Sequence, residues 1–315
     1  DVLLTFVESY GVATLEDPQF AAVVGPVLDS LEAAVARAGL VMASGTLESP
    51  TQGGQSWLAH GTAMSGLRLD TQLRYDLMVT GGHGTLVDDF RAAGHRSVAV
   101  MPAITTSWPE GDRLGYDTVY TRPRMPYAGP PLYWVTVPDQ YTMAFVEREL
   151  LGGPVGTRRR SGPPLFAEIA LVSSHAPWTP TVPLFAWDSV VDGSIFAPYA
   201  REGHPPEELW VDPDLLREEY PVSIAYSLRA MAGFLERDVD EHTLLIMLGD
   251  HQAAPWVTGA RSADVPIHVV TGDPALLEPF LAWGFRPGAF PDTARASPGM
   301  DELRGWLVGA FTPDR

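Results

Sequence analysis

The sequence predicts an α/β fold built on a largely parallel sheet. Short apolar runs alternate with stretches of helical periodicity, as in repeated βα units. Three of the apolar runs end abruptly in polar residues, and open α/β sheets place their ligands at the carboxyl ends of such strands. With 315 residues and 45% hydrophobic content, the chain can bury a large core.

The expected elements follow from local signals along the chain. Asp17 and Pro18 are typical of a helix N-cap and the first helical position, and Gly39 and Gly94 are typical of helix ends. The apolar runs predict strands. In order, we expect a strand at 2–7, helices at 17–38 and 86–93, strands at 97–101 and 169–172, a helix at 222–235, strands at 243–248 and 265–270, and helices at 274–282 and 300–311.

Two long stretches interrupt this alternation. Residues 123–138 and 179–213 are crowded with Pro, Gly and aromatic side chains and show no clear period. Loops of this length inside a compact domain are usually functional or cover a site. We therefore expect a single catalytic domain spanning residues 1–315, with these two stretches as loop insertions.

Composition excludes several classes of protein. The net charge is −18 and every basic residue is Arg, so a nucleic-acid partner is not expected. The absence of Cys removes disulfides, thiolate metal sites and cysteine nucleophiles. We see no apolar run of the roughly 20 residues that span a bilayer and no signal peptide. Because the chain opens directly on an apolar strand, we expect that a preceding segment was removed.

Potential metal ligands follow three of the apolar runs. Glu8 follows the first strand, His175 follows the strand at 169–172, and Asp250 and His251 follow the strand at 243–248. Carboxylate oxygens and imidazole nitrogens are ligands for hard and borderline divalent ions. Each of these residues alone could be an ordinary strand-end charge or cap.

A second signal is a glycine-rich turn that leads into a helix-compatible stretch. Gly53 and Gly54 precede Ser56, which would lie near the helix start. The unpaired N–H groups there favour an anion and help a hydroxyl to lose its proton. The simpler alternative is that Ser56 only caps the helix. His60, four residues on, would share a helix face with Ser56.

The order of these residues resembles the alkaline phosphatase/sulfatase superfamily. Ser56 is followed nine and ten residues later by Ser65 and Gly66, the spacing of Thr-Gly after the sulfatase nucleophile. Leu58 and His60 stand where sulfatases have Pro and Arg, which disfavours a sulfatase. Glu8 followed by Ser is similar to the lipoteichoic acid synthase-type phosphoglycerol transferase branch. The resemblance implies a three-layer αβα fold of the alkaline phosphatase type.

The resemblance also implies a set of site residues. Glu8, Ser56, Asp250 and His251 would hold one divalent ion, Mn²⁺ or Zn²⁺ or else Mg²⁺. Ser56 would be the nucleophile, and His175 would contact the phosphoryl group or protonate a leaving oxygen. The candidate substrate-binding residues are His175, Trp108, Trp178 and His60.

The head-group motif of that branch is only partly present. Trp108 is kept, but Met101 and Glu110 replace a His and an Arg, which puts phosphoglycerol in doubt as the substrate. The segment Gly115-Tyr116-Asp117 matches the family pattern downstream of it.

The resemblance therefore implies a metal-dependent phosphoryl or phosphoglycerol-type transferase, or a phosphodiesterase, acting on cell-envelope phosphoesters through Ser56. Its partner would be a lipid- or glycan-linked phosphoester. The chain would be the ectodomain of an actinobacterial protein at the extracytoplasmic face of the membrane, attached through segments absent from this sequence. Two alternatives stay open: a phosphatase or sulfatase-like ester hydrolase, and a catalytically degenerate binding domain.

Overall fold

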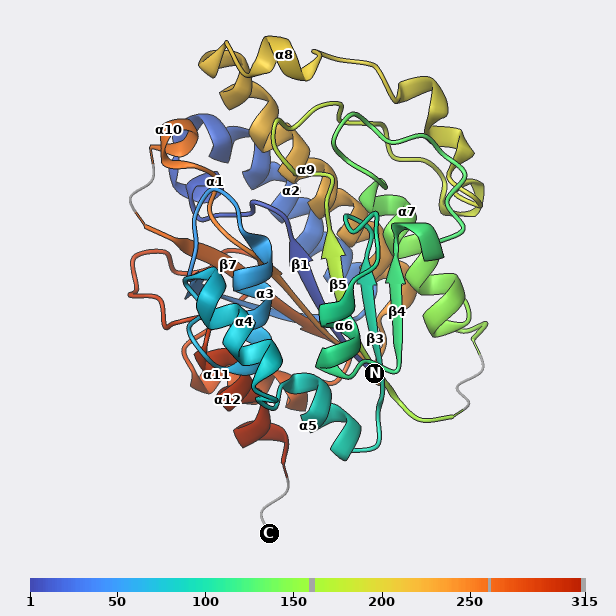
Figure 1. The fold of residues 1–315 in the computed structure, drawn as a ribbon, viewed down its shortest axis with the longest axis vertical. Helices are drawn as coiled ribbons and strands as arrows, with labels where there is room; N and C mark the ends of the chain where they lie inside the picture. The colour runs from blue at the N-terminus through green and yellow to red at the C-terminus, as the bar shows by residue number, and fades with distance from the viewer. Residues whose placement is uncertain (159–161, 260–261, 313–315) are drawn as a thin grey trace.

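A mixed sheet forms the centre of the molecule (Figure 1). It has eight strands in the order β4-β3-β5-β1-β6-β7-β2-β8. The computed structural model describes residues 1–158, 162–259 and 262–312. Pairing is parallel from β4 to β6, whereas β7 and β8 run opposite to the strands beside them. The strands are β1 (Val2–Val7), β2 (Val41–Glu48), β3 (Arg96–Met101), β4 (Thr118–Thr121), β5 (Leu165–Leu171), β6 (Leu244–Gly249), β7 (Asp264–Thr271) and β8 (Arg286–Pro287).

Helices cover both faces of this sheet, which gives the expected three layers. Successive residues of β1 point to opposite faces: Leu3 packs in one hydrophobic cluster with α2 and α9, and Leu4 packs in the other with α3 and α12. The α-helices are α1 (Ala13–Glu16), α2 (Pro18–Arg37), α3 (Ser56–Ser65), α4 (Gln72–Thr80), α5 (Leu86–Ala92), α6 (Pro109–Leu114), α7 (Asp139–Phe145), α8 (Pro206–Leu209), α9 (Pro213–Asp238), α10 (Pro255–Thr258), α11 (Glu278–Ala282) and α12 (Glu302–Phe311).

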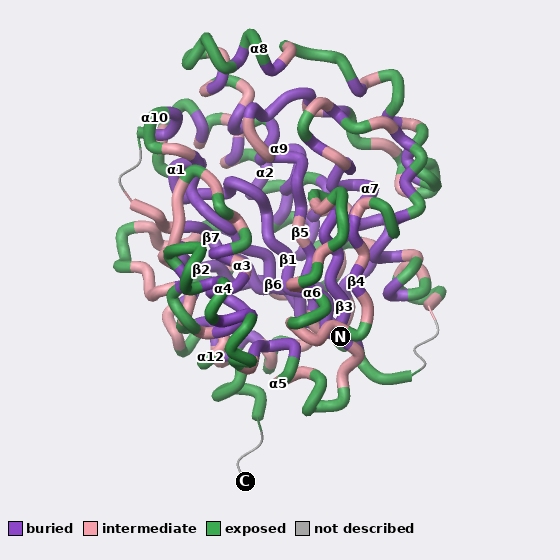
Figure 2. The backbone as a smooth tube through the Cα atoms, in the orientation of Figure 1, coloured by how far each residue is buried: buried purple, intermediate pink, exposed green. Residues whose placement is uncertain are grey.

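Burial follows from this layering. The central strands are buried along their whole length, whereas the outer faces of the helices are exposed (Figure 2). A parallel strand covered on both faces must be apolar nearly throughout, which is why β1 and β6 stand out in the sequence.

The expected elements are largely present, with three differences. Several elements are additional to those expected: strands β2, β4 and β8 and helices α1, α4, α6, α7, α8 and α10. Of these, β2 brings a further strand end to the site edge of the sheet. The helix expected at 222–235 is longer, because α9 begins at Pro213 under the N-cap Asp212 and continues through Pro221. The strand expected at 169–172 begins earlier, at Leu165.

The two expected insertions contain only short helices in addition to irregular chain. The stretch at 123–138 begins within η1, and the stretch at 179–213 contains η3, η4 and α8 before α9 begins. The remaining short helices are η1 (Arg122–Arg124), the π-helix η2 (Val146–Leu151), η3 (Trp187–Ser189), η4 (Ser194–Tyr199) and η5 (Pro274–Leu277).

In the described part of the chain, α2 has the length and apolar composition of a membrane span. This finding corrects the expectation that no apolar run is long enough to span a bilayer. Its apolar side is packed in the core, where Phe20 meets Tyr220 of α9 edge to face at 5.2 Å between ring centroids. These contacts are those of a core helix.

Candidate active site

Strand register brings the predicted ligands together. Val7 of β1 lies opposite Leu171 of β5 on one side and Gly249 of β6 on the other. The next residues along β1 and β6 are Glu8 and Asp250, which therefore leave the sheet side by side. β1 lies in the middle of the sheet, with β2 on one side of it and β3 on the other. The carboxyl end of β1 is therefore a topological switch point, where open α/β sheets place their ligands.

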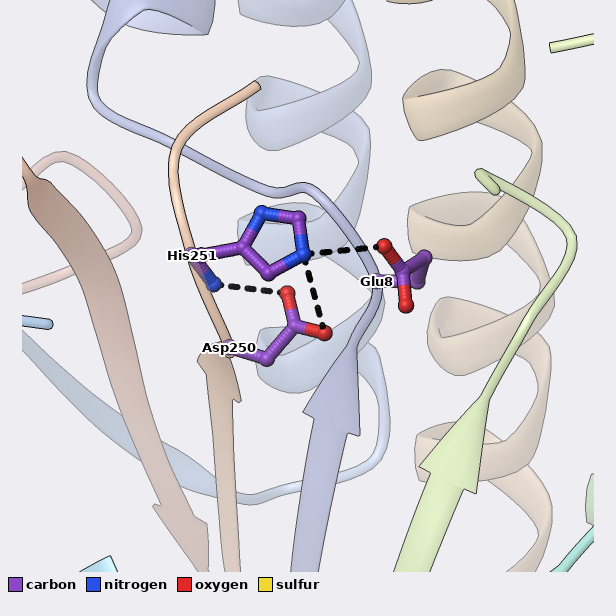
Figure 3. A group of neighbouring side chains, drawn as sticks. All are labelled: Glu8, Asp250 and His251. Atoms are coloured by element: carbon purple, nitrogen blue, oxygen red, sulfur yellow. Dashed lines mark hydrogen bonds and ion pairs between the residues drawn. The ribbon is translucent and has the colours of Figure 1, made fainter. Parts of the chain in front are cut away.

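Glu8, Asp250 and His251 form a compact, buried group (Figure 3). The Nε2 atom of His251 lies 3.2 Å from Glu8 Oε1 and 3.8 Å from Asp250 Oδ2. The three side chains are at most 8% exposed as residues. The structure thus places together three of the four ligands that the resemblance implies.

Ser56 completes the group from the other side. Its hydroxyl donates to Glu8 Oε2 at 3.0 Å and lies 3.3 Å from His251 Nε2. Ser56 is the first residue of α3, and Gln55 before it has a left-handed backbone with φ of 65°. The helix N-terminus therefore points its free N–H groups toward the space around the Ser56 hydroxyl.

The donor set fits a divalent ion. In a four-coordinate site with ligands at about 2.1 Å from the metal, neighbouring ligand atoms lie about 3.4 Å apart. The Nε2 atom of His251 lies 3.2, 3.3 and 3.8 Å from oxygens of Glu8, Ser56 and Asp250, which is close to this spacing. Three oxygen donors and one imidazole suit Mn²⁺ or Zn²⁺.

The titration of the group shows how strongly its members interact. Burial alone would raise the pKa of Glu8, but the charge and hydrogen bond of His251 lower that pKa well below its ordinary value. Burial and then the charge of Glu8 raise the pKa of Asp250 to about 6. Burial lowers the pKa of His251, but the charges of Asp250 and Glu8 overcome this and raise it to about 10. The two carboxylates therefore favour a positive charge beside His251 Nε2.

Further hydrogen bonds fix the loop that carries Glu8. The Ser9 N–H donates to Asp250 Oδ1 at 2.8 Å, and the Ser9 hydroxyl donates to Glu8 Oε1 at 2.9 Å. The Ser174 hydroxyl donates to the Glu8 carbonyl at 2.6 Å, and the Tyr220 hydroxyl donates to the Ser9 carbonyl at 2.7 Å. These contacts hold the carboxylates in place against their mutual repulsion.

His175 is presented by a rigid loop after β5. Asp139 is fully buried, and its Oδ1 accepts from the N–H groups of Val172 and Ser173 at 2.7 and 2.9 Å. The Nδ1 of His175 donates to the Ala176 carbonyl at 2.7 Å, so the Nε2 is left for the site. Sequence reasoning missed Asp139, which lies far from His175 in the chain and inside α7.

A cavity of about 270 Å³ opens beside Ser56. Glu8, Asp250 and His175 line this cavity, and so do the expected substrate contacts His60 and Trp108. Trp178 is a different case: it is 2% exposed, packs against Tyr220 at 4.9 Å between ring centroids and is not among the lining residues. The expectation that Trp178 contacts substrate is therefore corrected to a packing role under the His175 loop.

Two cavity residues were missed or left without a role. Glu168 lies within β5, is 2% exposed and accepts from His60 Nδ1 at 2.8 Å. The Tyr116 hydroxyl donates to the other oxygen of Glu168. An acid inside an otherwise apolar strand is the sequence signal for Glu168.

Comparisons with known proteins bear on the fold. No protein-family model matches the sequence, and no curated protein matches it. Among solved structures, a protein of the alkaline phosphatase superfamily from Vibrio parahaemolyticus has a TM-score of 0.55 and 14% identity, covering 98% of this chain, which spans 65% of its length. The lipoteichoic acid synthase LtaP from Listeria monocytogenes has a TM-score of 0.56 and 11% identity, over 100% of this chain and 73% of LtaP.

A third match is the phosphoglycerol transferase GacH from Streptococcus pyogenes, solved in complex with sn-glycerol-1-phosphate. It has a TM-score of 0.53 and 12% identity, over 85% of this chain and 67% of GacH. At these identities the comparisons establish the fold. The chain has the alkaline phosphatase superfamily fold, as the resemblance in its sequence implies.

Proposed function

We propose that this chain is a metal-dependent phosphotransferase or phosphodiesterase that works through a phosphoserine at Ser56. One observation carries the proposal: the Ser56 hydroxyl, at the start of α3, lies 3.0 Å from Glu8 and 3.3 Å from His251 in the lining of a cavity. A hydroxyl used only as a helix cap needs no such partners. The fold shared with LtaP and GacH supports the same reaction class.

Each side chain has a task in this reaction. Ser56 Oγ, whose proton points to Glu8 Oε2, attacks phosphorus, and the bond from phosphorus to the leaving alcohol breaks. His175 Nε2 protonates the departing oxygen, because its Nδ1 is engaged with the Ala176 carbonyl. A bound divalent ion would supply positive charge that lowers the pKa of the Ser56 hydroxyl and neutralises a phosphoryl oxygen.

The second half-reaction decides between transfer and hydrolysis. An acceptor alcohol or water attacks the phosphoserine, and the Ser56 oxygen leaves as the alcohol. We propose transfer to a lipid- or glycan-linked component of the cell envelope, at the extracytoplasmic face of the membrane. The net charge of −18 disfavours nucleic acid as the substrate. Leu58 and His60, in place of Pro and Arg, disfavour a sulfate ester.

The first test measures metal content and ester cleavage together. We expect about one Mn or Zn per chain, lost in a Glu8→Ala/His251→Ala double variant, and cleavage of a nitrophenyl phosphodiester in preference to a nitrophenyl sulfate. Added alcohol should shift the product toward a transferred ester. No bound metal after loading, together with no turnover of either ester, would overturn the proposal in favour of a binding domain.

The second test addresses the nucleophile. Ser56→Ala should lower turnover at least about 10³-fold, because the attacking atom is removed. Ser30→Ala, which removes an exposed hydroxyl on α2, is the matched control. Phosphodiester turnover should be measured in both variants, with circular dichroism to confirm folding. Near-normal turnover in Ser56→Ala would exclude Ser56 as the nucleophile.

A further inference from the structure

Part of the cavity beside Ser56 is lined mainly by aromatic and thioether side chains. We call it the inner chamber and define it by Tyr75, Met78, Met101, Trp108, Tyr116 and Glu168. Trp108 and Tyr116 form one wall, with ring centroids 6.3 Å apart and planes tilted by 33°. Tyr75, Met78 and Met101 are at most 6% exposed. The chamber is thus walled by aromatic rings and thioethers around a single carboxylate.

Glu168 is a buried carboxylate whose basic neighbour is the His60 imidazole, with His60 Nδ1 2.8 Å from Glu168 Oε1. It lies in the middle of β5, in register with Leu4 of β1 and Ala99 of β3. Its two oxygens accept hydrogen bonds from His60 and the Tyr116 hydroxyl. No Arg is among the described residues that line the cavity, and the chain contains no Lys. Burying a carboxylate costs free energy that a positively charged ligand would offset.

The surroundings of the chamber are negative as well. Burial raises the pKa of Tyr75, and the charges of Glu110, Glu168 and Asp76 raise it further. The acid Glu110 stands where the phosphoglycerol transferase pattern has an Arg, and Met101 stands where it has a His. The chamber therefore lacks the His and Arg of that pattern, and the acids in and around it favour a cation over an anion.

We propose that the inner chamber binds a quaternary ammonium group, so that the substrate is a zwitterionic phosphoester of the choline type. This inference rests on the proposed function, since it places the phosphoryl group at Ser56. A cation over aromatic faces is attracted by their quadrupoles, and Trp108 and Tyr116 provide two such faces. His60, which bonds Glu168, lies one helical turn from Ser56, which suits a short linker between phosphate and ammonium.

The lining of the chamber separates quaternary from primary ammonium. A primary ammonium has three N–H donors that need acceptors, whereas most of this lining is aromatic rings and thioethers, and each Glu168 oxygen already accepts one hydrogen bond. A peralkylated ammonium has no donors to satisfy, and its methyl groups pack well against thioethers and rings. The whole cavity, from Ser56 to the chamber, has a volume of about 270 Å³, which leaves room for such a group, since an apolar cavity of about 150 Å³ holds benzene.

The test compares ligands that differ by charge at constant shape. Calorimetry on the metal-loaded Ser56→Ala chain would measure binding of phosphocholine, its uncharged isostere 3,3-dimethylbutyl phosphate, phosphoethanolamine and glycerol 3-phosphate. We expect phosphocholine to bind about tenfold more tightly than each of the other three. Equal or tighter binding of the uncharged isostere would overturn the inference in favour of an apolar subsite. A preference for phosphoethanolamine or glycerol 3-phosphate would overturn it in favour of a polar one.

A charge-neutral variant supplies the second arm. Glu168→Gln should abolish the preference for phosphocholine over its isostere, while Glu149→Gln, an exposed acid outside the cavity lining, should keep it. If Glu168→Gln fails to fold, the comparison of the four ligands on the Ser56→Ala chain, which retains Glu168, still tests the inference. Turnover of phosphodiesters by the unmodified chain is measured separately. A choline preference without turnover contradicts only the proposed reaction, and turnover without that preference contradicts only the chamber assignment.

Discussion

The Ser56 hydroxyl, the Glu8 carboxylate and the His251 imidazole lie within 3.3 Å of one another, so the protonation state of each depends on the others. Two carboxylates, Glu8 and Asp250, meet there with one imidazole. The low polarity of the buried site makes their interaction strong. This explains why His251 holds a proton far above the ordinary range, with a pKa of about 10 in the metal-free protein.

This coupling predicts how metal affinity varies with pH. A metal ion must displace the His251 proton. At pH values below the pKa of about 10, metal affinity should therefore rise about tenfold for each unit by which the pH increases. Below about pH 6 the slope should steepen, because Asp250 also binds a proton. Competition of Mn²⁺ or Zn²⁺ with a chelator across this range measures the effect.

The control for this prediction is Glu8→Gln. Removing the Glu8 charge takes away one cause of the raised His251 pKa, so the pH dependence should move to lower pH as total affinity falls. An affinity independent of pH in the unmodified chain would show that His251 is not a ligand.

At the scale of elements, the turn before α3 determines where Ser56 lies. Gly54 has φ of +139°, a backbone conformation that L side chains rarely adopt, and no atom would lie within 4 Å of a Cβ there. Gln55 then adopts the left-handed region before the helix begins. Position 54 therefore favours glycine because of its backbone conformation, and not because a side chain there would clash with its neighbours.

A pair of glycine substitutions tests this turn. Gly54→Ala should lower the free energy of unfolding by about 1–3 kcal/mol, or shift Ser56 and reduce turnover, because the strain cannot be avoided. Gly305→Ala lies inside α12 with open space around it and should stabilise the protein by up to about 1 kcal/mol. Urea unfolding and phosphodiester turnover would be measured for both. Equal effects of the two substitutions would contradict the role assigned to the turn.

At the scale of the whole molecule, the buried side chain of His268 makes folding stability depend on pH. It is fully buried on β7, with its Nε2 3.0 Å from the Tyr10 hydroxyl and its Nδ1 2.7 Å from the Ser44 hydroxyl. Burial lowers its pKa from 6.5 to about 3. The unfolded chain therefore binds a proton on this ring at a pH where the folded chain does not.

This difference in proton binding determines whether the free energy of unfolding rises or falls with pH. The contribution of His268 to the free energy of unfolding is fully present above pH 6.5. It is lost as the pH falls toward 3, by at most about 1.4 kcal/mol per pH unit. His268→Gln should remove this part of the acid sensitivity, and His242→Gln, at an exposed turn, should not. Urea unfolding between pH 4 and pH 8 would show it. Parallel curves for His268→Gln and the unmodified chain would contradict the assignment.

The sequence by itself determined the fold class and most of the site. The runs before Glu8 and Asp250 could be recognised because a strand covered on both faces must be apolar nearly throughout, and a polar residue after such a run marks its carboxyl end. The order of Glu8, Ser56, Asp250 and His251 then carried the family resemblance, and the structure places these four residues together.

Tertiary structure alone decided the rest. Trp178 is packed in the core while Trp108 faces the cavity, and nothing local distinguishes the two. Asp139 and Glu168 act on loops and side chains far away in the chain, so their partners depend on strand register and helix packing. The size and charge of the inner chamber arise where α3, α4, α6 and β5 meet, and such a property belongs to no single segment.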